Sequence, residues 1–232
     1  MSSPPVRSRV LAVRGAKGSP GCTWLVAGLG KVYASGRLEV LLVDADAEAE
    51  GLLSVFGAPA GDGGRSLARA AKLGPPHPDV VRQAARAVSE RLWVLETMRA
   101  ADSLRGADLV AAARARHAVV IIDLGHRLEG LQRELESAAD WTLWVAATDR
   151  SGLERADRAL TFSPGLAAST GLVINRGAGP TLEGSAALLR DRYGLPVVAR
   201  LERGGAIRNR WRLRRMASAL HPDLARIGLP WS

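Results

Sequence analysis

The stretch GAKGSPGCT, residues 15–23, decides how the rest of this chain is interpreted. An apolar run, Val10–Val13, precedes it, and a segment that can form a helix, Trp24–Tyr33, follows it. A phosphate-binding loop has the pattern G-x-x-x-x-G-K-[ST] between a buried strand and a helix. Gly21 and Thr23 match the end of that pattern, with Cys22 in the position of the lysine, and Gly15 lies six positions before Gly21.

Such a loop binds phosphate mainly through its backbone. Successive N–H groups and the N-terminus of the following helix surround the phosphate oxygens. The lysine adds a full positive charge at the β- and γ-phosphates. A neutral thiol adds none, so the sequence predicts a phosphate site without its strongest side-chain donor.

The composition is that of a globular protein. The 232 residues suffice for one α/β domain with a sizeable core, and no apolar stretch is long enough to span a membrane. The N-terminal residues contain no apolar signal segment, so we expect a cytoplasmic protein, with nucleoid or membrane association as a further option. A single cysteine excludes an internal disulfide.

The charge balance is strongly basic, with a net charge of +9. This favours an acidic partner such as DNA or an anionic membrane surface. Only three of the 32 basic residues are lysine, namely Lys17, Lys31 and Lys72, and the rest are arginine. A GC-rich genome produces the same bias, so charge alone leaves both explanations open.

Short apolar runs alternate with helical stretches along the chain. The runs predict buried strands at Val10–Val13, Glu39–Val43, Leu92–Leu95, Ala118–Asp123, Trp141–Ala146, Gly171–Asn175 and Val197–Arg200. Helices are expected over residues 108–116, 129–138, 151–160 and 181–192, with Ser151 as an N-cap. Residues 57–64 and 74–78 are expected to be loops. The alternation predicts a single α/β domain with a mostly parallel sheet of about seven strands and helices on both faces.

Acidic residues follow two of these runs. Asp44 and Asp46 come after Val40–Val43, and Asp123 closes the run that begins at Ala118. Ligands of open parallel sheets bind at the carboxyl ends of the strands. A carboxylate at such an end commonly holds Mg²⁺ through water.

Together these motifs resemble the ParA/MinD class of P-loop ATPases, and more narrowly its pilus-assembly (CpaE/TadZ-like) and septum-site-determining branches in actinobacteria. Residues 17–23 resemble the deviant loop K-G-G-x-G-K-[ST], and Val43–Asp46 resembles the V-D-x-D segment. Ile121–Gly125 resembles the Walker B strand, and Leu172–Arg176 resembles the strand whose terminal asparagine contacts adenine. The resemblance implies a three-layer P-loop NTPase fold over residues 9–220, with a disordered N-terminal arm, residues 1–8, and a C-terminal tail, residues 221–232.

The resemblance also implies cofactors, partners and residue roles. ATP and Mg²⁺ would bind, and the protein would form a homodimer in which Lys17 reaches the partner's nucleotide. Lys17 and Asp46 would be catalytic, since Asp46 would orient the attacking water. Thr23 and Asp123 would hold the metal. The nucleotide would contact Gly15, Lys17, Gly18, Ser19, Pro20, Gly21, Cys22, Thr23, Trp24 and Asn175.

Three positions depart from the family's pattern. Ser19 replaces a glycine, Cys22 replaces the phosphate-binding lysine, and Trp24 replaces a small hydroxyl residue. Losing a charge-assisted contact weakens binding by about 1.5–3 kcal/mol. We therefore predict weak or absent ATP hydrolysis and weakened ATP binding. For Cys22, a small buried residue and a redox-sensitive thiol are the two interpretations.

A basic segment lies near the C-terminus. Residues 200–215 contain seven arginines and one acid. If residues 206–220 form a helix, Arg208, Arg212 and Arg215 lie opposite an apolar face, with Trp211 at the edge. The pattern predicts non-specific DNA contact or the solvated face of a core-packed helix, and the tail does not resemble a membrane-binding helix.

Three functions follow. The first is a dimeric positioning or scaffold factor, deficient in hydrolysis, for septum, pilus or secretion machinery or for DNA partition. The second is a slow Mg²⁺-dependent ATPase of the same family. The third is a nucleotide-independent scaffold that binds DNA.

Overall fold

The computed structural model describes residues 8–16, 21–46, 51–59, 61–97, 102–126, 129–161, 169–175, 185–202 and 210–220. The expectations for residues 1–7 and for the tail, residues 221–232, fall outside this part of the chain. The same holds for four residues of the loop: Lys17, Gly18, Ser19 and Pro20.

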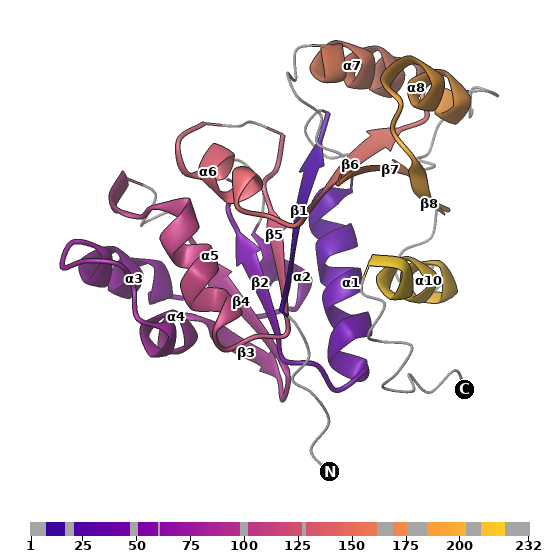
Figure 1. The fold of residues 1–232 in the computed structure, drawn as a ribbon. Coiled ribbons are helices and arrows are strands. Elements are labelled where there is room, and N and C mark those ends of the chain that lie inside the picture. The colour runs from indigo at the N-terminus through magenta and orange to yellow at the C-terminus, as the bar shows by residue number, and fades with distance from the viewer. Residues whose placement is uncertain are drawn as a thin grey trace.

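The described residues form one eight-stranded sheet (Figure 1). Its strands are β1 (Arg9–Gly15), β2 (Val40–Asp44), β3 (Arg86–Ser89), β4 (Leu92–Glu96), β5 (Val119–Asp123), β6 (Trp141–Ala147), β7 (Thr170–Asn175) and β8 (Val197–Leu201). Their order is β3-β4-β2-β5-β1-β6-β7-β8. Every neighbouring pair is parallel except β3 with β4.

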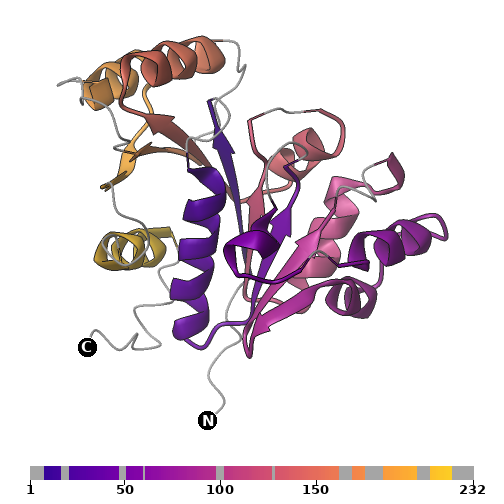
Figure 2. The ribbon, with the colours of Figure 1, turned by 180° about the vertical axis from the view of Figure 1, so that it is seen from behind.

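Helices cover both faces of the sheet (Figures 1 and 2). They are α1 (Cys22–Ser35), α2 (Leu52–Val55), α3 (Gly63–Ala71), α4 (Pro78–Ala84), α5 (Gly106–Arg114), α6 (Leu131–Ser137), α7 (Arg150–Thr161), α8 (Ser185–Tyr193) and α10 (Arg210–Leu220). The core under α1, α2 and α10 lies on one face. Two further cores, under α3 to α6 and under α7 and α8, lie on the other. The predicted three-layer α/β architecture with a mostly parallel sheet is confirmed.

One strand, β3, was not predicted from the sequence. β3 is a four-residue antiparallel edge strand whose residues are mostly exposed, so it has no apolar run to reveal it. It forms because Glu90 and Arg91 turn the chain directly into β4. An edge strand needs burial on fewer sides than a central one, and hydrophobicity therefore marks it poorly.

Some expected helix boundaries were wrong. Ser151 is not the N-cap of α7, because Asp149 Oδ1 accepts the Gly152 N–H at 2.8 Å and also the Ser151 hydroxyl at 2.7 Å. An aspartate that accepts a free N–H of the first turn performs the capping role. The expected loops are shorter than stated, because α3 begins at Gly63 and α4 begins at Pro78.

The central strands position the functional site. Residues Val119 to Ile122 of β5 are fully buried, as expected for a strand covered on both faces. In the register of the sheet, Asp123 lies opposite Val13 of β1 on one side and opposite Asp44 of β2 on the other. The carboxyl ends of these three strands therefore meet at one edge of the sheet.

The longest helix among the described residues is α1, with 14 residues. None of the helices there combines the length and the apolar character that crossing a bilayer requires.

Candidate nucleotide site

Backbone hydrogen bonds join the start of the loop to the end of β5. The Gly15 N–H donates to the Gly125 carbonyl at 2.8 Å, and the Leu124 N–H donates to the Val13 carbonyl at 2.9 Å. On the other side of β5, the Ala45 N–H donates to the Asp123 carbonyl at 2.9 Å. The start of the loop and both predicted acidic segments are thus held against one another by backbone hydrogen bonds.

The N-terminus of α1 faces this point. Its N-cap is Gly21, which adopts a left-handed conformation with φ of 96° and has no side chain to occupy the first N–H groups. The first turn of α1 contains no acidic residue. A helix N-terminus of this kind, with free N–H groups and a positive dipole end, suits an anion such as phosphate.

Asn175 lies against the same loop. It is the last residue of β7, and a Cβ at Gly21 would lie only 2.5 Å from the Asn175 Nδ2 atom. A side chain at position 21 would therefore displace Asn175, and the positive φ disfavours one as well. The structure brings together two residues, 154 positions apart in sequence, that were both expected to contact the nucleotide.

Asp123 is the most deeply placed acid of the site. Its side chain is 0% exposed, and its Oδ1 accepts the Gly125 N–H at 3.2 Å. Its pKa is raised to about 6, mainly by burial and also by the charges of Asp44 and Asp46, while hydrogen bonds from Thr23 and Gly125 act in the opposite direction. Its second oxygen, Oδ2, is buried and accepts no hydrogen bond from the described residues.

These residues fit a divalent cation. A buried carboxylate oxygen without a partner, beside the Thr23 hydroxyl, offers the oxygen ligands that Mg²⁺ prefers. Among the described residues, there is no group of three or more His, Cys, Asp or Glu that could hold a metal alone. Mg²⁺ here would complete its shell with water and phosphate oxygens, as it usually does at nucleotide sites.

Asp44 and Asp46 have different surroundings. The Asp44 carboxylate accepts the Leu52 N–H at 2.6 Å and the Asp46 N–H at 3.3 Å, so it fixes the chain that leaves β2. Burial raises its pKa to about 6. Asp46 lies beside the turn after β5, because a Cβ at Gly125 would lie 2.4 Å from the Asp46 Cγ atom. Asp46 thus lies close to the turn that follows Asp123.

Cys22 is a packed residue of the first turn of α1. Its side chain is 4% exposed, and burial raises its pKa well above the usual value. The charges of Asp123 and Asp46 add to this effect, while the charge of Arg14 opposes it. A thiol activated for redox chemistry needs an electropositive, accessible setting, and this one is buried beside carboxylates. These surroundings support the interpretation of Cys22 as a small buried residue. Trp24, two positions later, is half-buried and packs against the core beneath α1.

Arg14 is a cation of this region that was not predicted from the sequence. Its guanidinium donates to both carboxylate oxygens of Glu136 in α6, at 3.1 and 3.2 Å. It also stacks on the Trp144 ring of β6, with its central carbon 3.9 Å from the ring centroid. Arg14 therefore ties α6 to β6 directly below the loop, where the two cores of that face meet.

Arg14→Ala is expected to lower the free energy of unfolding by about 3 kcal/mol, because it leaves the mostly buried Glu136 without its partner and exposes Trp144. Urea unfolding followed by tryptophan fluorescence measures this. Arg150→Ala, which removes an exposed pair with Glu154, is the matched control and should change stability by well under 1 kcal/mol. Equal effects of the two variants would contradict a structural role for Arg14.

Solved structures of ParA and MinD proteins superpose on almost the whole chain. A ParA family ATPase from Chlorobium tepidum TLS has a TM-score of 0.71 and 16% identity, over 97% of this chain and 98% of that one. The chain has the ParA/MinD fold. The septum site-determining protein MinD from Pyrococcus horikoshii OT3, complexed with Mg-ADP, superposes with a TM-score of 0.70 and 16% identity. The match covers 92% of this chain and 96% of that one. A chain of the MinC:MinD cell division protein complex from Aquifex aeolicus has a TM-score of 0.67 and 19% identity. The match covers 97% of each chain.

At these identities the ParA/MinD likeness is one of fold. Comparison of the sequence with protein-family models gives no match, and neither does comparison with curated proteins. The assignment of individual residues to nucleotide and metal therefore depends on the geometry of this chain.

Two of the three expected nucleic-acid-binding residues, Arg212 and Arg215, lie on α10. Arg208 is outside the described residues. Arg212 forms an ion pair with Glu202 at 2.9 Å and donates to the Arg200 carbonyl at 3.1 Å, so it is engaged within the chain. Arg215 is exposed. The opposite face of α10 is buried, as the periodicity predicted, through Leu213, Met216, Ala217 and Leu220.

Proposed function

We propose that this chain is a nucleotide-binding positioning protein that binds Mg-ATP weakly, hydrolyses it slowly or not at all, and acts as a homodimeric scaffold. One observation carries the proposal. The buried Asp123 carboxylate, whose Oδ2 accepts no hydrogen bond within the described part of the chain, lies beside Thr23 at the N-terminus of α1, while the neighbouring lysine position holds the neutral Cys22. The arrangement keeps what a metal and phosphates need and omits the side chain that assists the transfer of phosphate.

The residues of the nucleotide site would have the following roles. Thr23 and Asp123 would hold Mg²⁺, which supplies positive charge to the phosphate oxygens when it is bound. The N–H groups after Gly21 would bind phosphate, and Asn175, which contacts the same loop, would bind the base. Asp46 would orient a water molecule.

Dimerisation is the proposed consequence of ATP binding, with Lys17 of each protomer completing the site of its partner. The MinC:MinD complex supports a scaffold role, because it shows a protein of this fold bound to another protein. The partners proposed here are components of septum, pilus or secretion machinery, or DNA.

Sedimentation velocity with Mg-ATP, Mg-ADP and no nucleotide tests the proposal. Mg-ATP should shift the protein towards a dimer, Mg-ADP should not, and Lys17→Ala should abolish the shift. Release of inorganic phosphate should stay at the level of the Lys17→Ala and Asp46→Ala variants. Turnover well above that background would instead make the protein a slow ATPase.

The alternative function is a nucleotide-independent DNA-binding scaffold, which the net charge of +9 and the exposed Arg215 favour. A mobility shift of duplex DNA that is the same with and without ATP would support it. That shift should weaken steeply between about 50 and 200 mM salt, since counterion release drives such binding.

A further inference from the structure

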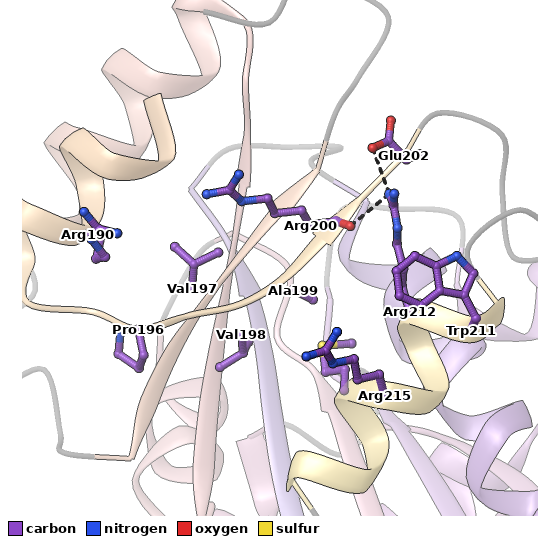
Figure 3. A pocket seen from close by; sticks show the side chains of 11 residues that line it. Arg190, Pro196, Val197, Val198, Ala199, Arg200, Glu202, Trp211, Arg212 and Arg215 are labelled. Carbon is purple, nitrogen blue, oxygen red and sulfur yellow. Dashed lines mark hydrogen bonds and ion pairs between the residues drawn. The ribbon is translucent and has the colours of Figure 1, made fainter. Parts of the chain in front are cut away.

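A groove of about 740 Å³ lies between β8 and α10, away from the nucleotide site. Its floor consists of apolar residues of β8 and the preceding turn: Pro196, Val197, Val198 and Ala199. Figure 3 shows Arg190 on one side of this floor and Trp211, Arg212 and Arg215 of α10 on the other, with Arg200 between them. The groove thus combines an apolar base with a cationic rim.

The floor is the edge of the sheet. β8 is the last strand in the order, and its described pairing is with β7 alone. The residues from Val197 to Arg200 are partly or fully exposed. An edge strand with an adjacent groove is a common place for an extended segment of another protein to bind.

The wall formed by α10 is fixed in place. Arg212 reaches back to β8 through its hydrogen bond to the Arg200 carbonyl and its ion pair with Glu202. This contact neutralises the acid of the groove lining. Trp211 lies beside it with 58% of its surface exposed, which is unusual for a residue of this size.

Two cations of the rim, Arg200 and Arg215, form no ion pair with any residue that the structure describes. Arg190 pairs with Asp191, but in the described part of the chain no carboxylate pairs with Arg200 or Arg215. The groove therefore presents unneutralised positive charge directly above apolar surface. A complementary ligand needs both carboxylates and apolar side chains.

The segments of this chain on either side of α10 do not have that chemistry. Residues 203–209 contain two arginines and no acid, and residues 221–232 contain one acid, Asp223, and one arginine, Arg226. Duplex DNA is not complementary to the groove either, because apolar side chains on the floor form no favourable contact with a phosphate backbone. The volume of the groove is in the range of pockets that hold small ligands, about 300–1,000 Å³.

We infer that the groove between β8 and α10 binds an acidic, extended segment of a partner protein. Carboxylates of that segment pair with Arg200 and Arg215, and its apolar side chains cover Val198, Ala199 and the face of Trp211. Arginine suits this role because its planar fork pairs with a carboxylate through two hydrogen bonds.

Fluorescence anisotropy with a fluorescein-labelled peptide of alternating glutamate and valine tests the inference on the whole protein. The peptide should bind, and the double variant Arg200→Glu/Arg215→Glu should weaken binding by about tenfold or more. Arg155→Glu/Arg158→Glu changes the net charge equally at two exposed arginines of α7 and should weaken binding less than about twofold. Arg200→Gln/Arg215→Gln serves in place of the first variant if charge reversal impairs folding.

Two further probes decide between specific and general attraction. A peptide with glutamine in place of glutamate, and one with glycine in place of valine, should each bind more weakly than the parent peptide. Equal losses in both arginine variants, or equal binding of the glycine peptide, would overturn the inference by showing general attraction to negative charge. Binding of a short DNA duplex that depends on Arg200 and Arg215, without peptide binding, would overturn it in favour of nucleic acid.

Discussion

Cys22→Lys is expected to raise the affinity for Mg-ATP by about 10- to 150-fold, which corresponds to the 1.5–3 kcal/mol of a charge-assisted contact. The position is the first of α1, and the loop before it is held to β5 by the Gly15 hydrogen bond. A lysine ammonium there would meet phosphates, and without nucleotide it would face the carboxylates that now raise the pKa of the thiol, Asp123 and Asp46. The new ammonium therefore has partners of opposite charge both with and without bound nucleotide.

Isothermal titration of the wild type and the variant with Mg-ATP measures this gain. Cys22→Ser is the matched control, because it is similarly small and adds no charge, and it should leave the affinity within about twofold. If Cys22→Lys binds no more tightly than Cys22→Ser, then phosphate does not reach the N-terminus of α1, and the proposed site is wrong.

Asp123→Asn is expected to raise the free energy of unfolding by about 3 kcal/mol near neutral pH. Burial raises the pKa of this carboxyl from 3.8 to about 6, and each unit is worth about 1.4 kcal/mol. Asparagine keeps the oxygen that accepts the Gly125 N–H and removes the charge that the folded protein buries. The same variant should lose any stabilisation by Mg-ATP, since it removes a carboxylate proposed to hold the metal.

The stability difference between Asp123→Asn and the wild type should depend on pH in a definite direction. A carboxyl whose pKa is raised by folding stabilises the folded state below about pH 4 and loses that contribution as pH rises through about 6. The advantage of Asp123→Asn over the wild type should therefore be small near pH 4.5 and grow up to about pH 7. Asp191→Asn, at an exposed position, is the control and should show no such growth. A pH-independent difference, or a less stable Asp123→Asn variant, would contradict the buried charge.

Strong local patterns made most of the fold predictable. Strands covered on both faces are continuous apolar runs, as Val119 to Ile122 show, and the alternation with helices implies a parallel sheet. β3 was not predicted, because it forms through its pairing with β4 and has no apolar run of its own. The N-cap of α7 was assigned to Ser151 because serine and aspartate are both good caps, and only geometry selects Asp149.

The candidate site was predictable only in part. The glycines, Thr23 and the acids at strand ends follow local motifs, and the sheet order places them together. The ion pair between Arg14 and Glu136 joins residues 122 positions apart, so no local pattern reveals it. That Asp123 Oδ2 has no hydrogen-bond partner among the described residues likewise depends on packing, which a single sequence does not reveal.

Thermal unfolding with and without Mg-ATP, with Mg-ADP as the comparison and Lys17→Ala as the control variant, tests most directly whether this site binds nucleotide. A ligand at about 100 times its Kd adds about 2.7 kcal/mol of stability. A rise in Tm that is specific to Mg-ATP and absent in Lys17→Ala is the expected result. No rise at millimolar nucleotide would contradict a nucleotide-binding function for this chain.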